Sequence, residues 1–115
     1  MLFSVAANTN YIIFGVIYLT SNATADFKFA FSVPTGTTGD QGASGLSTTV
    51  TQATSTIGNV VPVAVSNTNR LAVWVYASIL VGSTAGTLNF QWAQNTSDVG
   101  NTVVLAGSSL LVQTA

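Results

Sequence analysis

Alternating hydrophobic and polar positions run through much of this 115-residue chain, and they predict strands rather than helices. The clearest case is residues 27–33, where every second position is large and apolar, namely Phe27, Phe29, Phe31 and Val33. A period of two is typical of a strand that packs one face on a core and leaves the other in solvent. We therefore predict a core strand of an antiparallel sheet over this segment.

Residues 87–112 hold the pattern around which the rest of the chain is arranged. Leu88, Phe90 and Trp92 alternate with other residues, and a polar turn leads to a second short apolar strand. The pattern predicts two strands that form a hairpin against the core. Together with residues 27–33, it assigns five aromatic side chains to the core: Phe27, Phe29, Phe31, Phe90 and Trp92.

Residues 11–19 are almost continuously apolar, and their β-branched side chains favour a strand over a helix. A strand that is apolar on both sides is expected to be buried on both sides. Gly15, in the middle of the run, indicates a bulge or a close approach by another backbone.

Residues 71–81 also predict a strand that is apolar on both faces. One face can fill the core, and the other carries Trp74, Tyr76 and Leu80. That second face needs a cover, and in so small a domain the simplest cover is a second subunit. We therefore predict a subunit interface at these three residues; stacking of Trp74 and Tyr76 on a sugar ring is the alternative.

The middle of the chain is less regular. Residues 35–45 contain four glycines and no apolar residue larger than alanine, which predicts a long loop. Residues 46–57 are rich in threonine and predict an edge strand or an extended excursion, and residues 59–65 predict another strand. Pro62 confines that last strand to an edge or a bulge, because proline lacks the N–H that a central ladder needs.

These elements predict an all-β fold. No long segment shows the helical period of 3.6 residues, and about eight short strands separated by polar turns are typical of an antiparallel β-sandwich, here of jelly-roll type. The length fits one hydrophobic core, so we expect a single domain over residues 1–115.

Composition narrows the possible functions. Only 4% of the residues are charged and the net charge is -1, which excludes a basic surface for nucleic acid or an anionic membrane. No apolar run approaches the ~20 residues of a membrane helix. Since net charge helps to keep a protein monomeric, a chain with so little of it is expected to work in an assembly.

The chemistry available to the chain is also narrow. Histidine and cysteine are absent, which removes zinc sites, catalytic triads and thiol nucleophiles, and no cofactor is expected. The carboxylates are Asp26, predicted to pair weakly with Lys28 on one strand face, Asp40 in the glycine-rich segment, and Asp98 in a turn. We expect no enzymatic activity; a hydrolase site would have to bring these carboxylates together across a seam between subunits.

The two ends of the chain carry a family resemblance. Residues 86–112, GTLNFQWAQNTSDVGNTVVLAGSSLLV, resemble a recurrent pattern in bacteriophage structural proteins, where it closes a small β domain of tail-fibre, head-fibre and capsid-decoration proteins. Residues 5–36, VAANTNYIIFGVIYLTSNATADFKFAFSVPTG, are similar to the opening of that domain. The resemblance implies a virion structural role and assembly as a homotrimer.

Met1 leads almost directly into the first strand, which favours a capsid decoration or cement protein over a fibre tip that needs a stalk. The expected partners are sister subunits and the major capsid protein or another virion protein. The N-terminus lacks the pattern of a signal peptide, so we expect synthesis in the host cytoplasm and residence in the virion. The alternative is a fibre-tip adhesin that binds a bacterial surface glycan through exposed aromatic and amide side chains.

Overall fold

The computed structural model describes residues 1–46, 50–65 and 70–115, and all regular structure in these ranges is β. Along the chain, the strands are β1 (Leu2–Val5), β2 (Asn10–Thr20), β3 (Phe27–Ser32), β4 (Thr38–Leu46), β5 (Val50–Thr56), β6 (Val61–Val63), β7 (Leu71–Leu80), β8 (Gly86–Ala93), β9 (Val103–Val104) and β10 (Ser109–Thr114).

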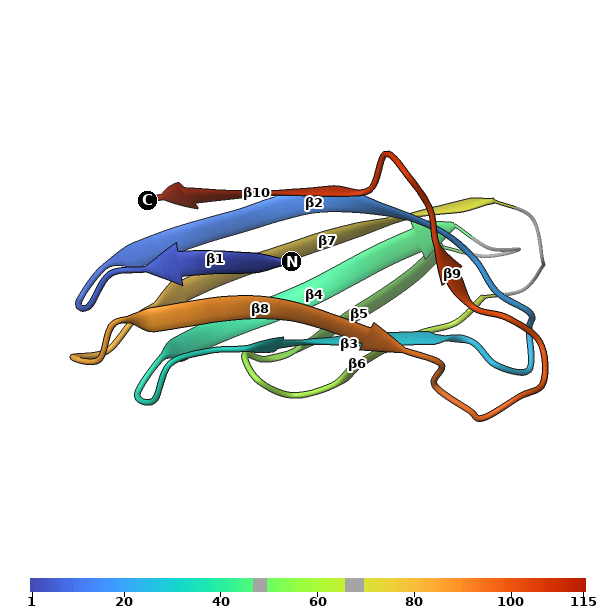
Figure 1. Cartoon of the computed structure of the whole chain (residues 1–115), viewed down its shortest axis with the longest axis horizontal. Helices are drawn as coiled ribbons and strands as arrows, with labels where there is room; N and C mark the ends of the chain where they lie inside the picture. The colour runs from blue at the N-terminus through green and yellow to red at the C-terminus, as the bar shows by residue number, and fades with distance from the viewer. Residues whose placement is uncertain (47–49, 66–69) are drawn as a thin grey trace.

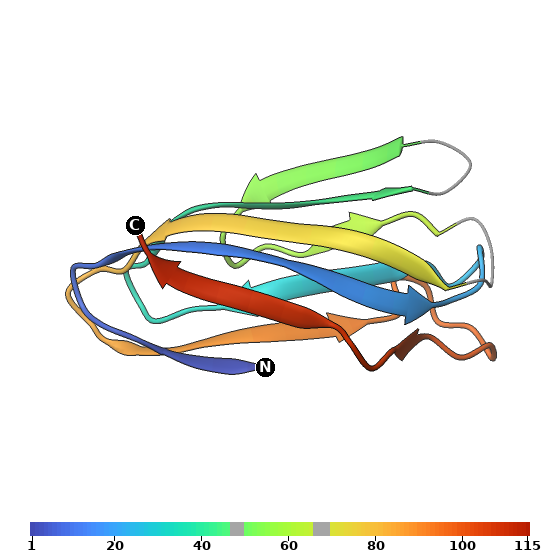
Figure 2. The same cartoon turned by 90° about the horizontal axis from the view of Figure 1, so that it is seen from above.

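Two antiparallel sheets pack face to face, as Figures 1 and 2 show from two directions. The four-stranded sheet has the order β1-β8-β3-β6. The six-stranded sheet has the order β10-β2-β7-β4-β5, and β9 pairs with the end of β2. From β1 to β8, successive strands change sheet except at β4 and β5, which is the arrangement of a jelly roll. The predicted β-sandwich is confirmed, with two further strands at the C-terminal end.

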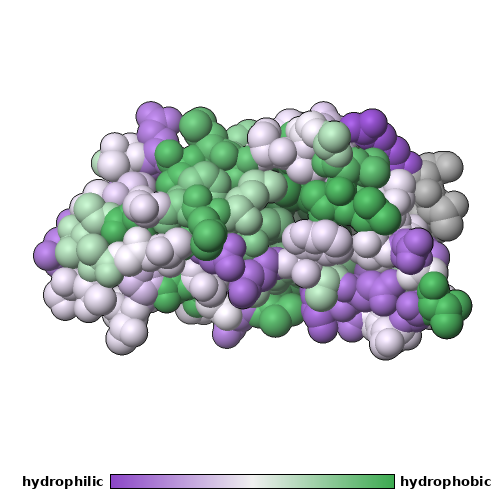
Figure 3. All heavy atoms as spheres, in the orientation of Figure 1, coloured by the Kyte–Doolittle hydropathy of each residue, from purple (hydrophilic) through white to green (hydrophobic). Residues whose placement is uncertain are grey.

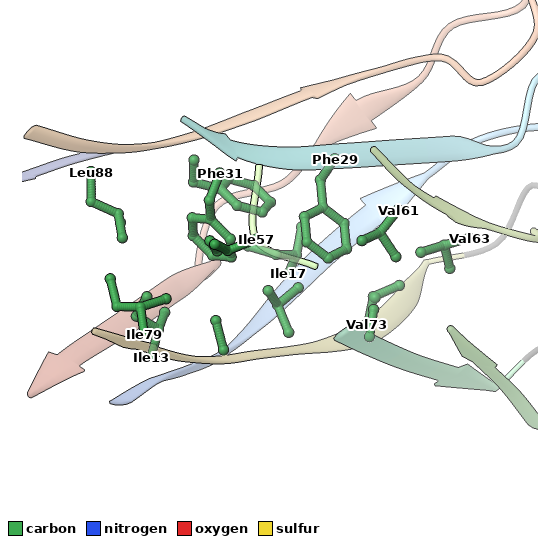
Figure 4. Packing of buried hydrophobic residues seen from close by; sticks show 14 of the residues in the cluster. Ile13, Ile17, Phe29, Phe31, Ile57, Val61, Val63, Val73, Ile79 and Leu88 are labelled. Atoms are coloured by element: carbon green, nitrogen blue, oxygen red, sulfur yellow. The ribbon is translucent and has the colours of Figure 1, made fainter. Parts of the chain in front are cut away.

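The core lies between the sheets. Phe27, Phe29 and Phe31 of β3 are at most 1% exposed, and Phe90 of β8 is 4% exposed. Figure 4 shows Phe29 and Phe31 pointing toward aliphatic side chains of the opposite sheet, such as Ile17. The ring of Phe90 lies 5.4 Å from the ring of Phe29 and 5.4 Å from that of Phe31. The core assignment of the four phenylalanines is therefore confirmed.

Trp92 is the exception, because its side chain is 42% exposed. Its position opposite Phe29 places it on the inner side of the sheet, and its ring stacks on Phe27 with 6.1 Å between centroids. The neighbouring strand β1, however, pairs with β8 only from Gly86 to Asn89. The prediction that Trp92 is a core residue is wrong: β1, which flanks β8 on one side, does not extend as far as Trp92, and the ring stays partly open to solvent.

The predicted hairpin of residues 87–112 is also wrong. β8 lies in the four-stranded sheet, whereas β10 pairs with β2 in the six-stranded sheet. The segment between them is too long for a tight turn, and it crosses the end of the sandwich by way of β9, which pairs with β2. Both strands were recognisable from local alternation, but their partners are distant in the sequence.

Residues 35–45 do not form the predicted loop, because most of them belong to strand β4 in the interior of its sheet. Its glycines let neighbouring groups pass close to the backbone. A Cβ on Gly42 would lie 2.7 Å from the ring of Tyr76, which crosses that position from the paired strand β7. From the same strand, the buried side chains of Ala43 and Gln41 face the core. The segment has few large apolar residues because neighbouring groups pack closely against its small ones.

The predicted edge strands are confirmed where the structure describes them. β5 is the last strand of the six-stranded sheet, and β6 with Pro62 is the last strand of the four-stranded sheet. Residues 47–49, which belong to the segment predicted as an edge strand or an excursion, lie outside the described residues.

Candidate interaction surfaces

The outer face of the six-stranded sheet carries a group of apolar side chains that the fold leaves uncovered. The ladder places Leu111 of β10 opposite Phe14 of β2, and Phe14 opposite Tyr76 of β7. Two residues further along the same strands, Val16 lies opposite Trp74. We call the following six residues, which share this side of the sheet, the apolar face: Ile12, Phe14, Val16, Trp74, Tyr76 and Leu111.

The centre of the apolar face is a pair of stacked rings. Phe14 and Trp74 lie 5.4 Å apart between centroids with 21° between their planes, and they are 50% and 47% exposed. Ile12 is 51% exposed and Leu111 62% exposed on either side of them. Stacked aromatic rings lose little side-chain freedom on binding, so this pair forms a preorganised contact surface.

A shallow hollow of about 260 Å³ opens beside these rings. Ile12, Phe14 and Tyr76 line one side of it, and Asp40 and Thr54 contribute to the other. Tyr76 reaches over the floor because Gly42 has no side chain to stop it. The hollow gives the apolar face a concave margin with a carboxylate at its rim, into which a side chain of a partner could insert.

The structure places two of the three predicted interface residues on the apolar face. Trp74 and Tyr76 lie there, whereas Leu80 is 48% exposed at the far end of β7, opposite Asn10 and Thr38. Leu80 is on the same outer side of the sheet, but it lies six residues along β7 from Trp74 and beyond Ser78, which is opposite Ile12.

Sequence reasoning missed the contributions of β2 and β10. The prediction that residues 11–19 are buried on both sides is wrong, because Ile12 and Phe14 are half-exposed while Ile13 and Ile17 are buried. A two-layer sandwich covers only the inner face of each sheet, so a strand that is apolar on both sides keeps one face uncovered. The same two-sided pattern had indicated exposure in residues 71–81, and it would have identified Phe14 as well. The close approach predicted at Gly15 is confirmed, since a Cβ there would collide with the carbonyl oxygen of Ser109.

Two of the three carboxylates have structural partners. Asp26 has a φ of 51° just before β3, and its Oδ1 accepts a hydrogen bond from the backbone N–H of Val65 at 2.8 Å. The predicted weak pair with Lys28 is therefore replaced by a contact that ties β3 to the chain after β6. Asp40 lies in β4 opposite Ser78, not in a loop.

Asp98 is a turn residue, as predicted. Its Oδ1 accepts hydrogen bonds from Asn22 Nδ2 and from the backbone N–H of Gly100, both at 2.7 Å. The amide of Asn22, and after it the N–H of Gly100, lower the pKa of Asp98 below the ordinary value of an aspartate. The same Asn22 accepts from the N–H groups of Thr24 and Ala25, so this network joins two loops at one end of the sandwich.

Across residues 1–46, 50–65 and 70–115, no group of three or more metal-ligating side chains is present, and no helix could span a membrane. No protein-family model, curated protein or solved structure matches the chain. The function must therefore be argued from the jelly-roll architecture and from the apolar face.

Proposed function

We propose that this chain is a structural protein of a bacteriophage particle: a decoration or cement protein that assembles as a homotrimer on the capsid surface. The observation that carries the proposal is the apolar face, with Phe14 and Trp74 stacked and half-exposed at its centre. The resemblance of the two ends of the chain to phage structural domains supplies the biological setting, and the low content of charge agrees with life in an assembly.

Contact through the apolar face removes substantial apolar area from water. Each half-exposed large side chain offers on the order of 100 Å², which corresponds to ~2.5 kcal/mol at ~25 cal/mol per Å² before the costs of association. Four such side chains lie together: Ile12, Phe14, Trp74 and Leu111. Exposed aromatic residues at the centre of a patch are the usual energetic centre of a protein interface.

Sister subunits are the first partners of this face. In a ring of three, the apolar face of one subunit packs against a different surface of the next. None of the six residues of the apolar face is charged, and the two charges near it have opposite signs: Asp40 lines the hollow, and Arg70 lies over the ring of Tyr18, the next residue on this side of β2 after Val16. Like-charge repulsion between copies is therefore small. The second partner is the assembled shell of the major capsid protein, which the Ser-, Thr- and Asn-rich loops would meet. Preferential binding to the assembled shell stabilises the particle by mass action.

The test is sedimentation of the purified chain at micromolar concentration, followed by incubation with capsids that lack it. The proposal expects a species of three chains or a multiple of three and co-sedimentation with capsids, and it expects Lys28→Ala to change neither result, since Lys28 lies on the other sheet. A monomer that does not bind capsids would overturn the proposal.

The second candidate is a fibre-tip adhesin that binds a bacterial surface glycan. It is favoured by the polar rim around the stacked rings, where Gln113 and Ser78 lie opposite Ile12 and Ser44 lies opposite Trp74. An exposed aromatic platform with neighbouring amide and hydroxyl groups can stack on a sugar ring and hydrogen-bond its edge. A glycan array separates the candidates, because a cement protein should bind no sugar on it.

A further inference from the structure

Strand β10 forms one border of the six-stranded sheet, as Figures 1 and 2 show. It pairs with β2 from Ser109 opposite Val16 to Thr114 opposite Tyr11, and within the described ranges no strand pairs with its other side. Its start is held in place by Ser108, whose Oγ accepts a hydrogen bond from the N–H of Tyr18 at 2.9 Å. The border of the sheet is therefore a well-anchored strand.

The hydrogen-bond pattern identifies which groups of β10 point away from the sheet. The N–H of Ala115 bonds to the carbonyl of Asn10 at 3.0 Å, so this is a hydrogen-bonded pair of the antiparallel ladder. Because such pairs alternate, Ser109, Leu111 and Gln113 also bond to β2. The backbone N–H and C=O groups of the intervening residues point outward: Leu110, Val112 and Thr114.

The neighbouring ladder supports this assignment. The N–H of Val81 bonds to the carbonyl of Thr9, so odd-numbered residues of β2 bond to β7 and even-numbered residues are left for β10. In agreement, Leu110 faces Gly15 so closely that a Cβ there would lie 2.8 Å from the Leu110 Cα. Close approach is typical of a pair that does not exchange hydrogen bonds.

The usual protections of an edge strand are missing from β10. Its sequence, SLLVQT, contains no charged residue and no proline, whereas the edge strand β6 contains Pro62. Leu111 is 62% exposed. Figure 3, in the orientation of Figure 1, shows apolar residues gathered along the part of the molecule where β10, β2 and β1 run. A neutral, apolar border with unpaired backbone groups is suited to strand addition.

We propose that β10 pairs with β10 of a second copy of this chain, antiparallel and around a twofold axis at Val112. In this register Val112 lies opposite Val112 of the other copy, and Leu110 lies opposite Thr114. Every outward N–H and C=O of these residues then finds a partner, because each opposing pair exchanges two hydrogen bonds. The two six-stranded sheets become one continuous sheet.

Three features favour a second copy over another occupant. An antiparallel pair of identical segments is self-complementary, which a twofold contact requires. The edge has no charge with which to select a charged partner. Leu111 connects the edge to the apolar face, so the contact brings the apolar faces of both copies onto one side of the joined sheet. The pairing does not depend on the proposed role in a phage particle: it uses backbone groups at the edge of the sheet, whereas the trimer contact uses side chains on its outer face.

A cysteine scan tests the register. The chain contains no cysteine, so single substitutions give a clean background. Val112→Cys should form a disulfide-linked dimer on mild oxidation, because the Cα atoms of an opposing hydrogen-bonded pair lie ~5.5 Å apart, within the range for a disulfide. Leu110→Cys should not, since Thr114 lies opposite it, but a mixture of Leu110→Cys and Thr114→Cys should cross-link. Equal cross-linking of Val112→Cys and Leu110→Cys, or none in either, would overturn the proposal.

Sedimentation of edge variants gives a second measurement. Val112→Pro removes an outward N–H without removing a bond to β2, so it should abolish the twofold species while the matched control Val112→Ala retains it. If the trimer contact also exists, Val112→Pro leaves trimers and Trp74→Asp leaves dimers, so failure of either proposal is visible separately. An open-ended size distribution that Val112→Pro does not change would indicate pairing at another edge and would contradict the twofold contact.

Discussion

The outer faces of the two sheets differ, although both sheets cover the same core. In the two central strands of the four-stranded sheet, β8 and β3, the outward residues are small or polar, including Ala30 opposite Gln91 and Ser32 opposite Asn89; Leu2 of β1 is a large apolar exception on this face. On the six-stranded sheet the corresponding positions carry the apolar face, with Phe14 stacked on Trp74. Stability of the fold requires only the inner faces, so the apolar residues on one outer face indicate a contact outside the subunit. The predictions below test this division between residues that hold the fold and residues that hold an assembly.

The largest effect is expected in the core. Phe29→Ala should lower the free energy of unfolding by ~3–5 kcal/mol, because Phe29 is 1% exposed and its removal leaves a cavity between two neighbouring phenylalanines. Denaturation in urea measures the loss. The matched control is Phe14→Ala, which should cost the isolated subunit less than ~1.5 kcal/mol, since half of that side chain is already in water. Similar losses of stability for both variants would contradict the division between residues that hold the fold and residues that hold an assembly.

The next effect concerns assembly. Trp74→Asp should weaken self-association ~100-fold, equivalent to ~2.7 kcal/mol, because it replaces one of the stacked rings of the apolar face with a charge. Gln91→Asp introduces the same charge on the exposed face of the other sheet and should leave association unchanged. Sedimentation equilibrium measures both. Equal weakening in the two variants would show that added charge, and not the position, disrupts the assembly.

A smaller effect is expected at Gly42 of β4, which lies under the ring of Tyr76 on the outer side of the six-stranded sheet. Gly42→Ala places a methyl group 2.7 Å from the ring of Tyr76 and should lower the free energy of unfolding by ~1–3 kcal/mol. The displaced ring should also alter the hollow beside the apolar face. The double variant Gly42→Ala with Tyr76→Ala should recover part of the loss, and thermal unfolding of the single and double variants tests this coupling. If the losses simply add, the ring does not restrict position 42.

The smallest effect is expected at the end of the sandwich. Since hydrogen bonds from Asn22 and Gly100 lower the pKa of Asp98, the ionised carboxylate stabilises the folded state. This contribution is present at neutral pH and is lost as the pH falls through the lowered pKa. The stability difference between wild type and Asp98→Ala should therefore shrink on acidification. Denaturation at neutral and acidic pH measures it, and Asn22→Ala should reduce the pH dependence in the same way.

Local patterns in the sequence predicted the fold class and most of the core, because alternation with a period of two depends only on neighbouring residues. Phe27 and Phe90 were assigned correctly on that basis. Pairing between strands depends on distant residues, and there the sequence was insufficient: the assumed hairpin of β8 and β10 spans two sheets. The glycine-rich strand β4 was missed because its glycines indicated a loop, whereas in the sheet they make room for side chains of a paired strand, such as the ring of Tyr76 over Gly42.

The candidate site was predicted only in part for a related reason. Trp74 and Tyr76 stood out because their strand has two apolar faces, while Phe14 was assigned to a buried position in a strand with the same property. Which strands lie side by side decides whether such residues gather into one surface. Leu111 joins that surface through the pairing of β10 with β2, which no local pattern in the sequence encodes.

The alternation of successive strands between sheets also constrains how the chain folds during synthesis. β7 lies between β2 and β4, and β8 lies between β1 and β3, so the strands of the first half obtain their central partners only when residues 71–93 are available. Until then, among the first six strands, only β4 with β5 and β3 with β6 have a partner. Pairing between strands that are distant in the sequence slows folding and leaves apolar strands unpaired and exposed until their partners are available. On a ribosome, this chain should remain largely unfolded until its last third has emerged from the exit tunnel.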